Sequence, residues 1–295
     1  MTARIGILTD DSAPELTDDG RAIVTRLERR GFSVEPIVWT DDAVDWDEYD
    51  AIVFRSCWDY HTAPERFQSL LAALEGADTV VYNPVSVIEW NVHKSYLFEL
   101  EAAGVQTVPT VLLEPGDDRT LESVLRDRGW EDAVVKPAIG ASSTGVWRTS
   151  LEAISRGEQR LEAERSDDVL VQPFLPAIRD GERSIVFVRG EYSHAWNDVP
   201  QADEFSAFDE TDLSYEPDDS VREAAAATLE TACELVGVGS EELAYARVDY
   251  LERNGEFVLM ELELIEPYLG LDRTENGIER FVEGVTTLLD QSSRL

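Results

Sequence analysis

Two acidic side chains spaced by one residue can share a metal ion when they stand on a β-strand. Glu261 and Glu263 lie in the segment 260–264, MELEL, and the alternation of a strand directs both to one face. Neighbouring carboxylates repel unless a cation joins them. Hard oxygen ligands of this kind suit Mg²⁺, which commonly takes one or two carboxylates plus the phosphates of a nucleotide. The alternative for this pair alone is an edge strand that shows its acids to solvent.

A second pair, Arg247 and Asp249, shares a face of the preceding predicted strand. The turn between the strands decides whether this pair meets the glutamates. A two-residue turn at 254–255 would leave Asp249 on the face away from Glu261. We predict a three-residue loop, 253–255 with Gly255 left-handed, or an equivalent bulge, which places Asp249 beside both glutamates. The cluster would then hold one or two Mg²⁺, and Arg247 would neutralise charge on a transferred phosphoryl group.

The chain contains only two lysines, Lys94 and Lys136, among 25 basic residues. Lys136 ends an apolar run and precedes the loop 140–145, GASSTG. Backbone N–H groups of such a loop and the compact charge of a lysine suit phosphate. The loop is not a Walker A motif, and no GxGxxG turn follows the first predicted strand. The alternative is that the two lysines are chance survivors of a lysine-poor composition.

Four further side chains are candidate substrate contacts. Arg55 and Tyr60 follow a predicted strand at 51–54, at the carboxyl end where parallel sheets bind ligands. Arg183 and His194 lie on later predicted strands. The alternative is structural: arginines in acidic proteins mostly pair with neighbouring carboxylates, and Tyr60 would cover a core edge.

The composition excludes some classes of function. With 61 acidic and 25 basic residues the net charge is −36, so phosphate-rich nucleic acids and anionic membranes would repel the chain. Acid excess with few lysines is typical of cytosolic proteins of salt-loving microbes, whose self-repulsion is screened by salt. Two distant cysteines indicate a reduced compartment, and neither a signal peptide nor a membrane-length apolar segment occurs. We expect a cytoplasmic, halophilic protein; a homo-oligomer is left open.

Hydrophobic periodicity divides the chain into three parts. Residues 1–86 alternate strands and helices as an open α/β unit. Residues 87–175 form an α+β unit around the glycine loop, with a helix at 87–103. Residues 176–295 form a third unit with a hairpin at 244–251 and 257–265 and helices at 221–236 and 278–289. The acidic stretch 201–219 is either a surface loop or a mobile flap, and its charge favours the loop.

The order of these motifs resembles that of ATP-grasp carboxylate-amine ligases. The set comprises Lys94, Lys136 with its loop, the segment 171–175, Arg247 with Asp249, and Glu261 with Glu263. The resemblance covers nearly the whole chain. It is greatest to the glutathione synthetase-like members and the D-cycloserine biosynthesis ligase, through 172–182, QPFLPAIRDGE, and 245–249, YARVD. It implies the ATP-grasp fold: an N-terminal Rossmann-like, pre-ATP-grasp domain, and two α+β lobes that clamp ATP.

The resemblance also implies roles for individual residues. Phosphates would be contacted by Lys94, Lys136 and the loop residues Ser142 and Ser143. The adenine pocket would be lined by Gln172, Pro173, Phe174 and Leu175, and the ribose would be bound by Glu182. The metal, Mg²⁺ or Mn²⁺, would be held by Asp249, Glu261 and Glu263, although the family usually has asparagine where Glu263 stands.

Family chemistry transfers the γ-phosphate to a substrate carboxylate, and an amine then displaces phosphate from the acyl phosphate to give an amide. Arg247 would stabilise both charged intermediates. The expected partners are therefore a small carboxylic acid and an amine. Ser184 and the pair Asn197 and Asp198 stand where related ligases carry basic residues, so a glutathione precursor is not favoured as substrate. A phosphotransferase on the same fold and a non-catalytic nucleotide-binding regulator are the alternatives.

Overall fold

The first part of the chain builds a parallel sheet of order β2-β1-β3-β4. The computed structural model of the protein describes residues 2–164, 166–200, 208–212, 214–253 and 255–292. This unit contains β1 (Arg4–Thr9), α1 (Asp18–Arg29), β2 (Ser33–Val38), β3 (Ala51–Ser56), α2 (Pro64–Glu75) and β4 (Val80–Tyr82). Every residue of β3 is buried, as expected of a parallel strand covered on both faces. The predicted open α/β unit is confirmed, with α2 and β4 as additional elements.

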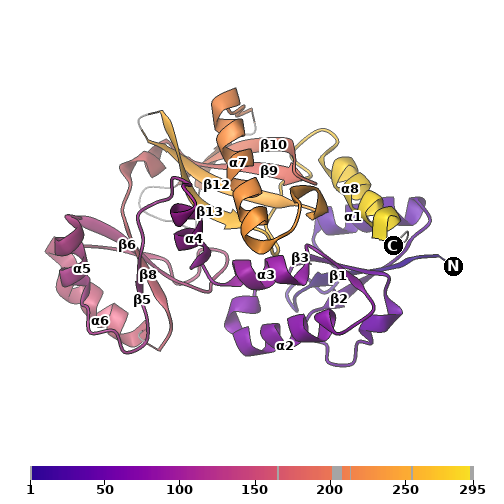
Figure 1. Ribbon diagram of the computed structural model, residues 1–295, viewed down its shortest axis with the longest axis horizontal. Coiled ribbons are helices and arrows are strands. Elements are labelled where there is room, and N and C mark those ends of the chain that lie inside the picture. The colour runs from indigo at the N-terminus through magenta and orange to yellow at the C-terminus, as the bar shows by residue number, and fades with distance from the viewer. Residues whose placement is uncertain (1, 165, 201–207, 213, 254, 293–295) are drawn as a thin grey trace.

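The second part forms an antiparallel sheet of order β5-β8-β6-β7. Its elements are α3 (Val85–Val92), α4 (Tyr96–Ala102), β5 (Val111–Leu113), α5 (Leu121–Arg128), β6 (Asp132–Pro137), β7 (Trp147–Ser150), α6 (Ile154–Glu164) and β8 (Val169–Pro173). Helices α5 and α6 lie on one side of this sheet, at the left end of the molecule in Figure 1. Leu121 and Leu125, on α5, are fully buried against it.

The predicted helix over 87–103 is wrong in one respect, because it is broken. His93, at the end of α3, has an extended backbone with ψ 123°, and Lys94 lies in the break before α4. The Lys94 backbone N–H donates to the carbonyl oxygen of Ala138 at 2.8 Å. A tertiary hydrogen bond therefore replaces a helical one, and it ties Lys94 to the segment that follows Lys136.

The third part is a five-stranded antiparallel sheet of order β11-β10-β9-β12-β13. Its elements are β9 (Glu182–Val188), β10 (Glu191–Pro200), β11 (Phe208–Asp212), α7 (Asp219–Val236), β12 (Ala246–Arg253), β13 (Glu256–Glu263) and α8 (Gly277–Ser292). The prediction of a loop over 201–219 is wrong for 208–212, which pair with β10 as an edge strand. Residues 201–207 and 213 of that stretch lie outside the described residues.

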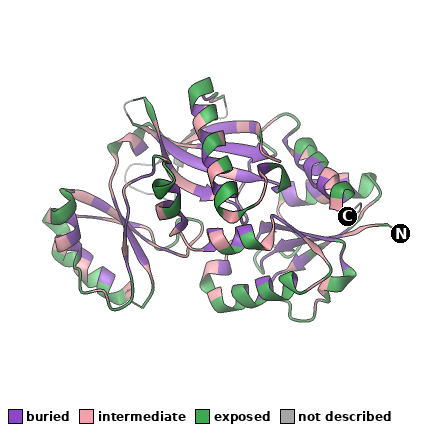
Figure 2. Cartoon of the chain, viewed as in Figure 1, coloured by how far each residue is buried: buried purple, intermediate pink, exposed green. Residues whose placement is uncertain are grey.

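The burial pattern shows how the parts are joined. The central strands of the sheets are buried, whereas the outer faces of the helices are exposed (Figure 2). The last helix, α8, packs on the first part: Phe281 and Val285 share a core with Ile23 and Leu27 of α1 (Figure 1). None of the described helices has the length and apolar character needed to cross a membrane. The boundaries between the three parts, which the sequence predicts after residues 86 and 175, stay a prediction.

Asn83 connects the first part with the third. Its side-chain amide donates to the carbonyl oxygens of Leu264 at 2.7 Å and Tyr245 at 2.9 Å, and it accepts from the Ala244 N–H at 2.8 Å. The residue is fully buried. These bonds fix the segments on either side of the hairpin β12–β13 against the parallel sheet.

Replacing Asn83 by alanine is expected to lower the free energy of unfolding by about 3 kcal/mol or more, because a buried group that loses its partner costs about 1–3 kcal/mol. Urea denaturation would measure the change. The matched control is Gln68→Ala, which removes an exposed amide on α2 and should change stability by less than about 0.5 kcal/mol. Equal stability of the two variants would show that Asn83 is not a structural link.

Candidate active site

The register of the hairpin β12–β13 decides which side chains meet. Arg253 pairs with Glu256, so the predicted three-residue loop is wrong. A bulge supplies the shift instead: Tyr250 pairs with Leu259 and Asp249 pairs with Glu261, which leaves Met260 unpaired. Gly255 is left-handed, with φ 80°. The predicted placement of Asp249 beside the glutamates is therefore confirmed by the bulge that we gave as the equivalent solution.

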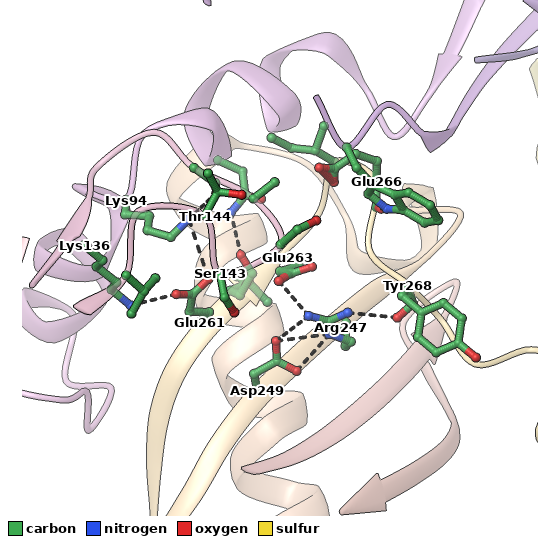
Figure 3. Close-up of a pocket in the computed structure, with 18 of the residues that line it drawn as sticks. Lys94, Lys136, Ser143, Thr144, Arg247, Asp249, Glu261, Glu263, Glu266 and Tyr268 are labelled. Carbon is green, nitrogen blue, oxygen red and sulfur yellow. Dashed lines mark hydrogen bonds and ion pairs between the residues drawn. The ribbon is translucent and has the colours of Figure 1, made fainter. Parts of the chain in front are cut away.

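The two lysines converge on Glu261. Lys136, on β6, places its Nζ 2.7 Å from one carboxylate oxygen of Glu261, and the Nζ of Lys94 lies 3.6 Å from the other. Lys94 also donates to the carbonyl oxygen of Gly140 at 2.8 Å. Both side chains are largely buried, at 6% and 11% exposure. The lysines come from different segments and face one carboxylate (Figure 3).

Arg247 joins the other two acids. Its guanidinium donates to Asp249 at 2.8 and 2.9 Å and lies 2.6 Å from Glu263, and it donates to the Tyr268 carbonyl oxygen at 2.9 Å (Figure 3). Ser184, on β9, donates to Asp249 at 2.7 Å. Because each bond fixes one edge of the planar guanidinium, Arg247 is held rigidly between two carboxylates.

These side chains line one cavity of about 440 Å³, to which all three parts of the chain contribute. The glycine loop forms one wall, since Gly140, Ser142, Ser143 and Thr144 all line the cavity. Ser142 and Ser143 have left-handed backbones, with φ 52° and 55°. The cavity is also lined by Trp58, Tyr60, Asn91, Glu182, Trp196, Asp198, Glu266 and Tyr268.

The cavity contains more acidic than basic side chains among its described lining residues. Burial would raise the pKa of Glu261, but Lys136 and Lys94 outweigh it and lower that pKa to about 2. The other acids are less well compensated. Burial, and then the charges of Asp249 and Glu261, raise the pKa of Glu263 to about 7 and that of Glu182 to about 8. Burial, and then the charge of Glu263, raise the pKa of Glu266 to about 8.

The acid set fits a divalent cation by its chemistry. Asp249, Glu261 and Glu263 offer hard oxygen ligands on adjacent strands, and the raised pKa of Glu263 marks negative charge that a cation would offset. The described residues do not present three acids already grouped around one point, because lysines engage Glu261 and Arg247 engages the other two. A bound metal would therefore share these carboxylates with the basic side chains or displace them.

The segment predicted to line the adenine pocket lies outside the lining of this cavity. Gln172 is buried and donates to the Thr110 hydroxyl at 2.9 Å. Phe174 packs under Arg148, whose guanidinium carbon lies 3.7 Å from the ring centre. Pro173 ends β8, and Leu175 follows Phe174 towards β9. Glu182, predicted to bind the ribose, does line the cavity.

Of the four candidate substrate contacts, only Tyr60 lines the cavity. Arg55 is buried in an ion pair with Asp19 at 3.0 Å. Arg183 lies 3.4 Å from Glu252. His194 contacts the Leu269 carbonyl oxygen at 2.8 Å, and burial lowers its pKa. Each of these three side chains contacts a partner within the protein, which favours the structural interpretation, but the Nε of Arg55 and the Nε and Nη1 of Arg183 have no hydrogen bond among the described residues.

The sequence interpretation missed several lining residues. Trp58 stands in the polar cluster after β3, where a crevice was predicted, but no role was given to it. Trp196 and Tyr268 offered no signal in their spacing. Glu266 did offer a signal, because it is the third acid in the segment 261–266, ELELIE. It lies after the end of β13, however, so strand alternation does not place it on the same face as the other two acids.

Solved structures share this architecture. The crystal structure of the D-cycloserine synthetase DcsG superposes with a TM-score of 0.87 and 26% identity, covering 97% of this chain and all of that one. An ATP-grasp RimK domain protein from Sphaerobacter thermophilus gives a TM-score of 0.70 at 18% identity, covering 97% and 99% of the two chains. The predicted ATP-grasp fold is confirmed.

Sequence comparison decides the family. Residues 5–83 match the family model of the N-terminal domain of D-cycloserine synthetase DcsG. The cycloserine biosynthesis protein DcsG of Streptomyces lavendulae is 31% identical over 97% of this chain and 98% of its own length. The chain belongs to the DcsG family of ATP-grasp ligases. A glutathione synthetase of Ralstonia nicotianae is 25% identical over 57% of the chain and 54% of its own length.

The family relationship settles the class of activity. This ATP-grasp ligase is an ATP-dependent, ADP-forming enzyme, so the regulator without turnover is not supported. ATP-grasp ligases use ATP and Mg²⁺. The predicted resemblance to glutathione synthetase-like proteins and the D-cycloserine ligase is confirmed.

Proposed function

We propose that this ligase joins a small carboxylic acid to an amine, with ATP as the energy source and with the cavity around Glu261 as the site of reaction. The observation that carries the proposal is the convergence of Lys94 and Lys136 on the face of the hairpin that presents Glu261, Glu263 and Asp249. Two cations and a set of oxygen ligands in one buried place are what a metal-bound polyphosphate requires. DcsG acts in cycloserine biosynthesis, as its name states, and the acid and amine of the present enzyme are proposed only as classes.

We assign the phosphates to Lys94, Lys136 and the loop residues Ser142 and Ser143. The lysines supply point charges, and the loop supplies backbone N–H groups. Glu261 positions both ammonium groups in the cavity. We assign the ribose to Glu182, which lines the same cavity. The adenine assignment to residues 172–175 rests on the family resemblance alone.

Asp249, Glu261 and Glu263 would hold Mg²⁺, with Mn²⁺ as a substitute, and the ion would offset charge on the phosphates. Arg247 has the role of stabilising charge on the substrate carboxylate as it accepts a phosphoryl group and then releases it. Its bonds to Asp249, Glu263 and Tyr268 hold it in place before the reaction. Preorganised donors of this kind need no rearrangement when charge develops.

A screen for ADP release with amino acids and small hydroxy acids, in Mg²⁺ and KCl, tests the proposed reaction. Product analysis then separates the two possible outcomes of phosphoryl transfer. An amide formed together with ADP supports the ligase, whereas a stable phosphorylated acid would show a phosphotransferase. Absence of ATP binding in the same buffer would contradict the assignment of this cavity.

We propose a cytoplasmic setting at high salt from the net charge of −36. The melting temperature is expected to rise as KCl increases from about 0.1 M to about 2 M, because the Debye length falls from about 10 Å to under 3 Å and repulsion between surface carboxylates is screened. Differential scanning calorimetry measures it. A melting temperature that stays constant or falls over this range would contradict the halophilic setting.

A further inference from the structure

His93 lies directly before Lys94, where α3 ends. Its backbone is extended, with ψ 123°, and its side chain is 26% exposed. The described residues that line the cavity include Lys94 but not His93. Any effect of His93 on the reaction must therefore act through residues that it holds in place.

Both ring nitrogens of His93 have a hydrogen-bond partner. The backbone N–H of Ser95 donates to Nδ1 at 3.2 Å, and Nε2 lies 3.0 Å from a carboxylate oxygen of Asp168. A backbone N–H can only donate, so Nδ1 is the unprotonated nitrogen and Nε2 carries the ring proton. The Nε2–H group therefore donates to the Asp168 carboxylate, and this charge-assisted bond fixes the orientation of the ring.

Asp168 belongs to the sheet that carries Lys136. It directly precedes β8, and its carbonyl oxygen accepts from the Ala138 N–H at 2.8 Å. The Ala138 carbonyl oxygen in turn accepts from the Lys94 N–H at 2.8 Å. These bonds form a closed loop, because His93 contacts Asp168 and directly precedes Lys94 in the chain. The break between α3 and α4 is thereby attached at two points to the sheet, next to the end of β6.

A fixed backbone at Lys94 matters because its long side chain must reach a defined point. The ammonium group lies 3.6 Å from Glu261 and donates to the Gly140 carbonyl oxygen at 2.8 Å. The four-carbon stem of a lysine is flexible, so a shift of its backbone would open many other positions to the ammonium group. Misplacing a group that acts on a substrate by about 1 Å can lower a rate by about 100-fold.

We propose that His93 is a positioning residue, which fixes the ammonium group of Lys94 opposite Glu261 by hydrogen bonding to Asp168. The proposal rests on the proposed function where it concerns catalysis, because that function assigns Lys94 to the phosphates. The placement of Lys94 itself can be measured without ATP. A His93–Asp168 pair that only stabilised the fold would change the melting temperature of a variant without moving Lys94.

The lysine content of the chain allows a direct measurement. Lys94 and Lys136 are its only lysines, so protein labelled with ¹³Cε-lysine gives two side-chain NMR signals, which Lys136→Met assigns. His93→Asn keeps an acceptor for the Ser95 N–H but loses the donor to Asp168. It should move the Lys94 signal by more than its line width and lower kcat/KM for MgATP by about tenfold, the effect of losing a charge-assisted hydrogen bond.

Three further variants complete the test. His93→Gln places an amide N–H where Nε2 stands, so the Lys94 signal should stay in place and kcat/KM should fall by less than about threefold. Asp168→Ala removes the acceptor and should move the Lys94 signal in the same direction as His93→Asn. Arg66→Gln, the matched control, removes an exposed ion pair with Asp42 that is also 3.0 Å long. Both lysine signals and ADP formation should then stay as in the wild type.

Circular dichroism melts establish which variants are folded. A folded His93→Asn or Asp168→Ala protein whose Lys94 signal coincides with that of the wild type would overturn the proposal. Equal displacement of the signal in His93→Asn and His93→Gln would also overturn it, because the bond to Asp168 would not be the cause. Addition of MgATP to the wild type separates this result from the proposed function. Lysine signals that do not respond to MgATP would contradict the phosphate site, whereas the comparison of the His93 variants would still decide the placement of Lys94.

Discussion

Replacing Lys136 by methionine is expected to lower the rate of ADP formation by about 100-fold or more, because a preorganised donor to developing charge contributes about 10²–10³ in rate. Methionine keeps most of the side-chain volume in a site that is 6% exposed, so the variant should fold. Steady-state assays of ADP release measure the loss. Lys136→Arg should also be poorly active, since the planar guanidinium does not replace a compact ammonium.

The control for this experiment is Arg126→Met. Arg126 is an exposed cation on α5 that pairs with Glu122, and surface pairs of this kind contribute little to stability. Its turnover should equal that of the wild type. A folded Lys136→Met protein with wild-type turnover would contradict the assignment of Lys136 to the phosphates.

Replacing Glu261 by glutamine is expected to have an effect of similar size for a different reason. The pKa of Glu261 is held at about 2 by Lys136 and Lys94 against the effect of burial, so this group is ionised throughout the pH range of ordinary assays. Glutamine removes the charge that positions both lysines. It also replaces one carboxylate oxygen, a candidate ligand of the proposed metal, by an amide nitrogen. We expect about 100-fold lower turnover and a Mg²⁺ requirement raised by about tenfold.

Assays of ADP release over a series of Mg²⁺ concentrations would separate the two effects of the Glu261→Gln variant. Glu122→Gln, on the surface of α5, is the isosteric control and should leave both the turnover and the Mg²⁺ dependence unchanged. If Glu261→Gln retained full turnover with an unchanged Mg²⁺ requirement, the metal assignment would be wrong.

Much of the site was predictable because it depends on local periodicity. Strand alternation places Glu261 and Glu263 on one face, and a run of apolar residues ending at Lys136 places that lysine at the end of β6. The order of the motifs along the chain was enough to predict the ATP-grasp family. These features need only short-range information, which the sequence contains.

Other features depend on tertiary contacts that no local pattern reports. The break in the helix at Lys94 is stabilised by a hydrogen bond to Ala138, 44 positions away. For Asp249 to share a face with the glutamates, the hairpin needs either a three-residue loop or a bulge, and the sequence does not distinguish between them. The structure shows that the hairpin has a bulge opposite Asp249. The sequence could not show whether Arg55 contacts a substrate or pairs within the protein, because its partner Asp19 lies on another element.

The low lysine content now has a physical interpretation. Where a basic residue serves only a surface ion pair, arginine replaces lysine without loss. Lys94 and Lys136 stand where two cations must reach one carboxylate within a buried space. Two small ammonium groups can approach Glu261 from different segments, whereas two guanidinium groups would need more room. The retained lysines therefore agree with the proposed phosphate site.

A crystal structure of the ligase with Mg²⁺ and ADP tests the central claim most directly. We predict a metal about 2.1 Å from an oxygen of Glu261, and the ammonium groups of Lys94 and Lys136 within about 3 Å of phosphate oxygens. The β-phosphate should lie between the glycine loop and the hairpin β12–β13. A nucleotide whose phosphates contact neither lysine, or a metal bound away from Asp249, Glu261 and Glu263, would contradict the proposed site.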